Sequence, residues 1–222
     1  MDGTLIDSTA GVLGAWNLFS QQYPGLNVPD ILSSAHGVRT VDNLRRFCGI
    51  EDPIELENEA VRFEEAIVTS SKENGGQGIV LLPGVREIID EVAPGAKYPK
   101  PCWTICTSAT GAYATKALLS VGIEIPDAIV YAEDVEKGKP NPDPYLLGAK
   151  RCGVDPKSCL VVEDAPAGVL SGSAAGCKTL ALITSHSREQ LIAVKPDFLV
   201  DNLASVTMKR VKDGVDVTIM TP

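Results

Sequence analysis

The fold is decided by the stretch CLVVEDAPAGVLSGSAAGCKTLALI, residues 159–183. It begins with the apolar run 159–162, continues with a helical pattern over 166–176, and ends with a second apolar run over 179–183. Two apolar runs of strand length joined by a helix predict a βαβ unit, whose strands are parallel and covered on both faces. The stretch therefore predicts an α/β fold.

The same alternation of strands and helices extends to both sides of this stretch. Three more apolar runs of strand length lie at 102–106, 128–131 and 198–200, and helical patterns at 113–121 and 144–152 follow the first two of them. Such units wind right-handed into an open parallel sheet, whose ligands bind beyond the carboxyl ends of the strands. Near the end of the chain, Asp213-Gly214 between two partly alternating stretches predicts a β-hairpin.

The first third of the chain has a different pattern. Residues 9–78 show helical spacing without strand-like runs, and the segment 53–71 is a Glu-rich helical pattern. The stretch 74–78, Asn-Gly-Gly-Gln-Gly, predicts a flexible joint. We therefore expect an α/β core formed by residues 1–8 and 79–222, interrupted near its beginning by a helical insert over residues 9–78.

The composition argues against several classes of partner. Among the 222 residues, Lys+Arg 20 and Asp+Glu 29 give a net charge of −9, which nucleic acid and anionic membrane surfaces repel. No apolar run approaches the roughly 20 residues of a membrane span. The six cysteines form neither a CxxC pair nor a Cys/His ligand pattern, so zinc is not expected. We expect a monomeric, cytoplasmic protein that binds no nucleic acid and no membrane.

Chemically active side chains come in four short motifs, each expected just after a strand. The motifs are Asp2-Gly3-Thr4, Thr107-Ser108, Lys137-Gly138-Lys139-Pro140 and Glu163-Asp164. Because the carboxyl ends of parallel strands meet at one edge of a sheet, these side chains are expected to lie close together. Two acidic clusters, hydroxyl donors and a lysine suit phosphoryl transfer, in which the charge on the phosphoryl oxygens must be neutralised. The carboxylates are also suitable ligands for Mg²⁺.

Each motif has an ordinary structural explanation when it is seen alone. An Asp-Gly pair is common in turns, Thr-Ser after a strand commonly caps a helix, and a Lys-Gly-Lys-Pro run is commonly a solvated turn. These roles do not explain why all four motifs occur together in this order. The joint pattern therefore favours a magnesium-dependent phosphoryl-transfer enzyme.

The four motifs resemble those of the haloacid dehalogenase (HAD) superfamily of phosphatases, over essentially the whole chain. More narrowly, the chain resembles the glycerol-phosphatase and 2-deoxyglucose-6-phosphate phosphatase group. The stretches that carry this likeness are His36-Gly37-Val38-Arg39-Thr40, Leu82-Pro83-Gly84-Val85, the run 138–146 and the run 163–168. The resemblance implies a Rossmann-like parallel-sheet core with an inserted helical cap. It also implies a phosphomonoesterase that hydrolyses a small sugar or polyol phosphate through an aspartyl-phosphate intermediate.

The resemblance implies catalytic roles for residues of the core. Asp2 is similar to the second aspartate of the family's DxDGT motif, which protonates the leaving alcohol, then activates water, and gives its backbone carbonyl to magnesium. Thr107, with Ser108 beside it, would bind the phosphoryl group. Lys139 would stabilise that group as a point charge.

Metal and substrate roles are implied in the same way. Asp164 would bind Mg²⁺ directly, and Glu163 beside it would be a further ligand or would hold a water. The helical insert resembles the family's mobile cap, from which Gly37 and Arg39 would meet the substrate. Asp7 would order the hinge between cap and core.

The sequence departs from the family pattern at its start. The nucleophilic aspartate of DxDGT would stand directly before Met1, and the apolar strand that leads into it would precede that. We expect this chain to be a truncated form of a phosphatase. The alternatives are a sugar phosphomutase of the same superfamily or a non-catalytic binding protein with the HAD fold. Gly111 stands where close relatives often carry a basic residue, which leaves the phosphate ester open.

Overall fold

The parallel sheet predicted from residues 159–183 is present in the computed structural model, which describes residues 1–73 and 76–220. Strand β3 (Leu160–Glu163) pairs with β4 (Lys178–Leu182), and β4 pairs with β5 (Phe198–Val200), all parallel. Helix α8 (Pro166–Ala174) connects β3 to β4 and packs against both strands. The central strand β4 is buried on both faces of the sheet from residue 179 to 182, as expected for a parallel strand with neighbours on both sides.

Two other apolar runs do not become full strands. The predictions of strands at 102–106 and 128–131 were wrong in this respect, since only Cys106 and Val130 form a parallel bridge. The backbone N–H of Thr107 donates to the carbonyl of Val130 at 2.9 Å, and the N–H of Val130 donates to the carbonyl of Ile105 at 2.8 Å. A strand needs a continuous ladder of such backbone hydrogen bonds to a neighbouring strand. The segment 102–106 instead borders a cavity.

The cavity has a volume of about 620 Å³ and is lined by residues 102–106, by β3 and by Met1. Helix α5 (Val85–Val92) contributes apolar side chains to its wall. Among the described residues, β3 pairs with β4 alone, and the buried side-chain atoms Trp103 Nε1 and Thr104 Oγ1 have no hydrogen-bond partner. The free edge of β3 and the segment 102–106 therefore border the same cavity.

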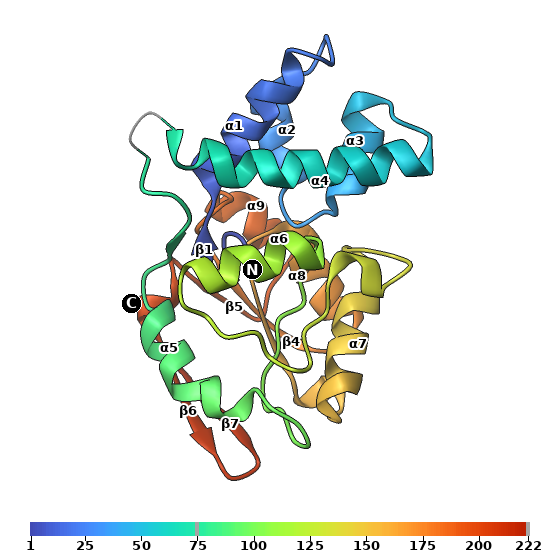
Figure 1. The fold of residues 1–222 in the computed structure, drawn as a ribbon. Coiled ribbons are helices and arrows are strands. Elements are labelled where there is room, and N and C mark those ends of the chain that lie inside the picture. Colours follow the sequence, from blue (N-terminus) through green and yellow to red (C-terminus); the bar gives the residue numbers. More distant parts are fainter. Residues whose placement is uncertain (74–75, 221–222) are drawn as a thin grey trace.

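Four helices form a separate layer above the sheet (Figure 1). They are α1 (Thr9–Ser20), α2 (Val28–Ala35), α3 (Thr40–Cys48) and α4 (Pro53–Ser70). Helix α4 begins where the sequence provides a cap, because the Asp52 carboxylate accepts a hydrogen bond from the backbone N–H of Glu55 at 2.8 Å. The layer has its own aromatic core, in which the Phe63 ring lies 4.6 Å from Trp16 and 5.0 Å from Phe19. We call α1–α4 the cap helices.

The chain passes between the cap helices and the sheet through two short strands that lie side by side. Strand β1 (Ile6–Asp7) pairs antiparallel with β2 (Val80–Leu81). The Asp7 carboxylate accepts a hydrogen bond from the backbone N–H of Thr9 at 2.9 Å, at the start of α1. The exact division of the chain at residues 8 and 78 stays a prediction, and residues 74–75 of the expected joint lie outside the described residues.

The remaining helices and strands complete the α/β body. Helix α6 (Gly111–Ser120), α7 (Asp143–Cys152) and α9 (Arg188–Ala193) lie around the sheet (Figure 1). The predicted hairpin is confirmed as β6 (Val206–Val211) and β7 (Gly214–Ile219), and β6 packs against α5. Within residues 1–73 and 76–220, every helix is too short or too polar to cross a membrane.

Candidate active site

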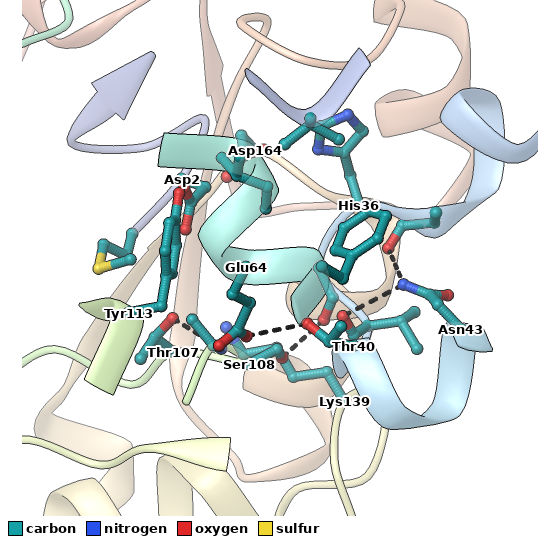
Figure 2. A pocket seen from close by; sticks show the side chains of 18 of the residues that line it. Asp2, His36, Thr40, Asn43, Glu64, Thr107, Ser108, Tyr113, Lys139 and Asp164 are labelled. Atoms are coloured by element: carbon teal, nitrogen blue, oxygen red, sulfur yellow. Dashed lines mark hydrogen bonds between the residues drawn. The ribbon is translucent and has the colours of Figure 1, made fainter. Parts of the chain in front are cut away.

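One cavity of about 100 Å³ lies between the cap helices and the body, and both contribute side chains to it (Figure 2). The body contributes Asp2, Thr107, Ser108, Tyr113, Lys139, Glu163 and Asp164. The cap side contributes the polar residues His36, Gly37, Thr40, Asn43 and Glu64. Six predicted core residues and Gly37 are thus brought together, although they come from five different parts of the sequence.

The Asp2 carboxylate is held by two hydroxyl groups. Its Oδ1 accepts hydrogen bonds from Ser8 Oγ and from the Tyr113 hydroxyl, each at 2.7 Å. As far as the described residues show, Oδ2 remains for a proton or a ligand. Burial, together with the charge of Asp2, raises the pKa of Tyr113 well above its ordinary value, so this phenol stays a hydrogen-bond donor to Asp2.

Gly3 allows Asp2 to lie beside Asp164. Its φ angle of +70° lies in the left-handed region, which glycine adopts without steric cost. A Cβ atom at this position would stand 2.1 Å from Asp164 Oδ2. The glycine of the Asp2-Gly3-Thr4 motif is therefore required both by the backbone and by the close approach of a carboxylate.

Lys139 and Glu163 form a buried ion pair. Lys139 Nζ donates to Glu163 Oε1 at 2.6 Å and to the carbonyl of Cys106 at 2.9 Å. The Tyr145 hydroxyl donates to the same Oε1 at 2.7 Å, and the backbone N–H groups of residues 164 and 165 donate to Oε2. Burial opposes ionisation of Glu163, but the charge of Lys139 and the hydrogen bonds from Lys139 and Tyr145 hold the pKa of this carboxyl below its ordinary range.

These contacts give Glu163 a positioning role. Both of its oxygens accept hydrogen bonds from protein donors, and the carboxylate fixes the ammonium group of Lys139 within the cavity. That Glu163 is a further magnesium ligand or holds a water stays a prediction, and these four hydrogen bonds occupy acceptor positions on both of its oxygens. Its effect on the site comes through Lys139.

Asp164 is the carboxylate best placed to hold a cation. It is 3% exposed, and its Oδ1 accepts a hydrogen bond from Thr4 Oγ1 at 2.6 Å, while Ser185 Oγ donates to Oδ2. Burial and, after it, the charge of Glu163 raise the pKa of Asp164. A buried carboxylate that is disfavoured as an anion is stabilised by a bound cation.

The donor set fits a magnesium ion that takes some ligands from elsewhere. Asp2 and Asp164 line the same cavity, whereas the described part of the chain contains no cluster of three or more His, Cys, Asp or Glu side chains suited to a metal ion. Magnesium is usually bound through one or two carboxylates, with waters and substrate phosphate oxygens completing the octahedron. Asp164 and the Asp2 loop could therefore hold Mg²⁺ together with a phosphate.

Thr107 and Ser108 lie where the bridged segment ends and the loop to α6 begins. Thr107 is buried, and its Oγ1 accepts a hydrogen bond from the backbone N–H of Ala109 at 3.1 Å. Ser108 Oγ donates to the carbonyl of Gly37 at 2.9 Å. Ser108 thus connects the phosphate-binding loop predicted from the sequence to the cap side of the cavity.

The two predicted cap residues differ in position. Gly37, with φ +79°, packs so tightly that an added Cβ atom would stand 2.6 Å from the Cβ of Ala165. Arg39 is not among the described residues that line the cavity. Its guanidinium pairs with Asp42 at 2.7 Å and donates to the carbonyls of residues 135 and 136. Arg39 therefore fastens the cap to the loop before Lys139, and its predicted contact with substrate receives no support.

Glu64 is the main site residue that the sequence argument missed. It is 3% exposed, and it accepts hydrogen bonds from Thr40 Oγ1 at 3.0 Å and from the backbone N–H of Thr110 at 3.2 Å. The segment around it was interpreted only as a Glu-rich helix. The available signal was its position, because Glu64 shares helical spacing with the buried Leu56, Ala60 and Ile67.

Comparison with known proteins shows which family and which relatives the chain resembles. A family model described as a haloacid dehalogenase-like hydrolase matches residues 1–176. Hexitol phosphatase A of Escherichia coli is 36% identical over 219 residues, which cover 99% of this chain and 95% of that protein. Glycerol-1-phosphate phosphohydrolase 2 of Saccharomyces cerevisiae is 32% identical over 213 residues, which cover 93% of this chain and 81% of the yeast protein.

The fold agrees as well. The crystal structure of a hydrolase from Pseudomonas syringae superposes with a TM-score of 0.73 at 25% sequence identity, and the match covers 92% of each chain. The predicted α/β fold and the resemblance to sugar and polyol phosphatases are confirmed. This chain belongs to the haloacid dehalogenase-like hydrolases.

Proposed function

We propose that the protein is a magnesium-dependent phosphomonoesterase that hydrolyses a small polyol or sugar phosphate, with hexitol phosphates and glycerol 1-phosphate as the first candidates. The observation that carries the proposal is that Asp2, Thr107, Lys139 and Asp164 line one small cavity beneath the cap helices. The two relatives with phosphatase names match nearly the full length of this chain.

The floor of the cavity provides for the phosphoryl group. The Lys139 ammonium, held by Glu163, supplies a fixed positive charge, and the hydroxyl of Thr107 supplies a donor, whereas the Ser108 hydroxyl already donates to the carbonyl of Gly37. Donors that are already in place stabilise the charge that develops on the phosphoryl oxygens without reorganisation. Magnesium bound by Asp164 and the backbone carbonyl of Asp2 would supply further positive charge at the same oxygens.

Asp2 is suited to general acid and base catalysis. Ser8 and Tyr113 both bind its Oδ1, which fixes the carboxyl group and leaves Oδ2 for the substrate. Protonated Asp2 would give its proton to the leaving alkoxide, and the resulting carboxylate would then take a proton from the water that attacks phosphorus. A side chain held in one orientation performs both transfers without a search for the correct geometry.

The nucleophile is proposed to lie on the residue directly before Met1, at the end of a strand that fills the 620 Å³ cavity. Met1 lines both this cavity and the candidate active site, so a residue attached to it would begin where the two meet. The unpaired edges at 102–106 and β3 would supply backbone hydrogen bonds to such a strand. Its aspartate would attack phosphorus and form the aspartyl-phosphate.

The test compares three proteins: the chain as printed, the chain extended by an apolar strand ending in Asp before Met1, and the same extension ending in Asn. Each is incubated with Mg²⁺ and a panel of polyol, hexose and deoxyhexose phosphates, and released phosphate is measured. We expect release only from the form that ends in Asp. Activity of the printed chain would refute the assignment of the nucleophile. Isomerised sugar phosphate without release would indicate a phosphomutase, and a folded but silent extended form would indicate a binding protein.

A further inference from the structure

We propose that Glu64 binds a hydroxyl group of the substrate's leaving alcohol, and that it thereby selects polyol and sugar phosphates over simple alkyl phosphates. This inference rests on the proposed function and deepens it. It concerns the cap side of the cavity, whereas the phosphoryl group is bound on the body side. The argument depends on where the carboxylate lies and on how many of its acceptor positions are already used.

Glu64 is a buried acid that lies beside apolar side chains of the cap. It projects from α4 into the cavity (Figure 2). Phe63 and Ile67 from the same helix and Trp16 from α1 also line the cavity. Burial, with the charge of Asp2 as a smaller cause, raises the pKa of Glu64. A carboxylate buried among aromatic and aliphatic side chains is costly unless hydrogen-bond donors surround it.

The protein supplies three of these donors. Glu64 Oε1 accepts hydrogen bonds from Thr40 Oγ1 and from the backbone N–H of Thr110, and Oε2 accepts one from Thr110 Oγ1. A carboxylate has about four acceptor positions, two on each oxygen. The described residues therefore leave one position on Oε2, and Glu64 is among the residues that line the cavity. A hydroxyl of the leaving alcohol is the donor that would fill it.

The other polar groups on the cap side have complementary chemistry. Thr40 donates its hydroxyl hydrogen to Glu64, so its oxygen is left as an acceptor. Asn43 also lines the cavity and donates its amide N–H to the carbonyl of Ala35 at 2.9 Å, so the acceptor that its side chain retains is the carbonyl oxygen. Acceptors thus predominate here, whereas positive charge and hydroxyl donors predominate around Lys139. A polyol, rich in hydroxyl donors and joined to an anionic phosphate, matches both sides.

A structural role of Glu64 and a role in binding the substrate hydroxyl have different consequences for ligand binding. The bonds from Thr110 connect α4 of the cap to the first turn of α6 in the body, so Glu64 also helps to hold the cap closed. Loss of that connection would weaken the binding of every ligand that needs a closed cap. Loss of a hydroxyl contact would weaken only the ligands that carry the hydroxyl. The two roles are therefore separable by the choice of ligand.

The experiment measures binding, which does not require the nucleophile. With Mg²⁺ present, calorimetric titrations of the chain as printed would use hexitol phosphate, glycerol 1-phosphate, propyl phosphate and inorganic phosphate. We expect E64Q to weaken binding of the two polyol phosphates about tenfold or more, because a hydrogen bond to a charged acceptor is stronger than one between neutral groups. Propyl phosphate and inorganic phosphate should change less than about threefold, since their affinity comes from the body side of the cavity.

Two variants control the comparison. E65Q makes the same change at the exposed neighbouring position on α4 and should leave all four affinities unchanged. E64D keeps the charge but withdraws it by one methylene, so it should weaken the polyol phosphates more than propyl phosphate and inorganic phosphate, and it carries the test if E64Q does not fold. Equal weakening of all four ligands, or no weakening of the polyol phosphates, would overturn the inference. Failure of the unaltered chain to bind any phosphate compound would overturn the proposed function itself, and this inference with it.

Discussion

At the scale of single residues, the ion pair between Lys139 and Glu163 connects the stability of the body to the chemistry of the site. Both side chains are nearly fully buried. Two charges removed from water are tolerated only when each compensates the other and the remaining polar atoms are hydrogen-bonded. The hydrogen bonds that Glu163 accepts from Tyr145 and from two backbone N–H groups meet the second of these conditions.

Lys139→Ala should therefore reduce both stability and phosphate binding. It leaves Glu163 buried without its cation, and breaking a buried pair from one side costs about 3–5 kcal/mol. Urea unfolding measures this loss. The double variant Lys139→Ala/Glu163→Gln should recover much of the stability, because no unpaired charge remains, but it should not recover phosphate binding. Recovery of binding in the double variant would show that Lys139 does not contact the phosphate.

The same pair predicts how stability depends on pH. Because the pKa of Glu163 is lower in the folded protein than its ordinary value, its contribution is fully present above the ordinary Glu pKa of about 4.3. It is lost as the pH falls from there through the lowered folded value. The difference in unfolding free energy between the unaltered chain and Glu163→Gln should therefore shrink on acidification from pH 5.5 to pH 3. A constant difference would contradict the assignment of the charge.

Asp2→Asn should remove general acid catalysis while leaving phosphate binding intact. In the extended, active protein we expect kcat for a polyol phosphate to fall by about 10²–10⁴. The loss should be smaller for p-nitrophenyl phosphate, because its leaving group needs no proton. Steady-state kinetics with both esters distinguish this role from a structural one, since misfolding would reduce both rates equally.

At the scale of structural elements, the turn between α2 and α3 determines how closely the cap approaches the body. Gly37 lies in this turn and packs on Ala165 in the loop after β3. Ser108 donates to its carbonyl from the body side. The turn therefore makes contact with two of the loops that form the floor of the cavity.

Gly37→Ala should hold the cap away from the body and lower kcat/KM at least about tenfold in the extended protein. The added methyl group meets Ala165, and a positive φ angle costs roughly 1–2 kcal/mol in a residue with a side chain. Gly49→Ala is the matched control, because Gly49 has a similar φ of +71° at the end of α3 but open space around its Cβ position. Both variants should lose stability through the positive φ angle, Gly37→Ala at least as much as Gly49→Ala, and only Gly37→Ala should lose activity.

At the scale of the whole molecule, patterns that depend on neighbours in sequence were predictable and those that depend on distant contacts were not. The βαβ unit at 159–183 and the hairpin around Gly214 follow from local periodicity and turn chemistry. The runs 102–106 and 128–131 have strand-like sequences, but their ladders require a partner segment. Likewise, the motifs predicted which core residues gather in the cavity, whereas the orientation of Arg39 and the contacts of Glu64 arise from packing between helices and loops.

The 620 Å³ cavity makes a prediction about the whole molecule that is independent of catalysis. An apolar strand added before Met1 should pair with 102–106 and β3, because both present unpaired backbone groups to the same space. Extensions ending in Asp and in Asn should both raise the free energy of unfolding by several kcal/mol, since residual cavity volume costs about 24 cal/mol per Å³. Hydrogen exchange should slow at the amides of residues 102–106 and 160–163. An extension of equal length with a central proline should produce neither effect, because it cannot complete the ladder of hydrogen bonds. If that control protected the amides equally, the added chain would not lie in the cavity as a strand.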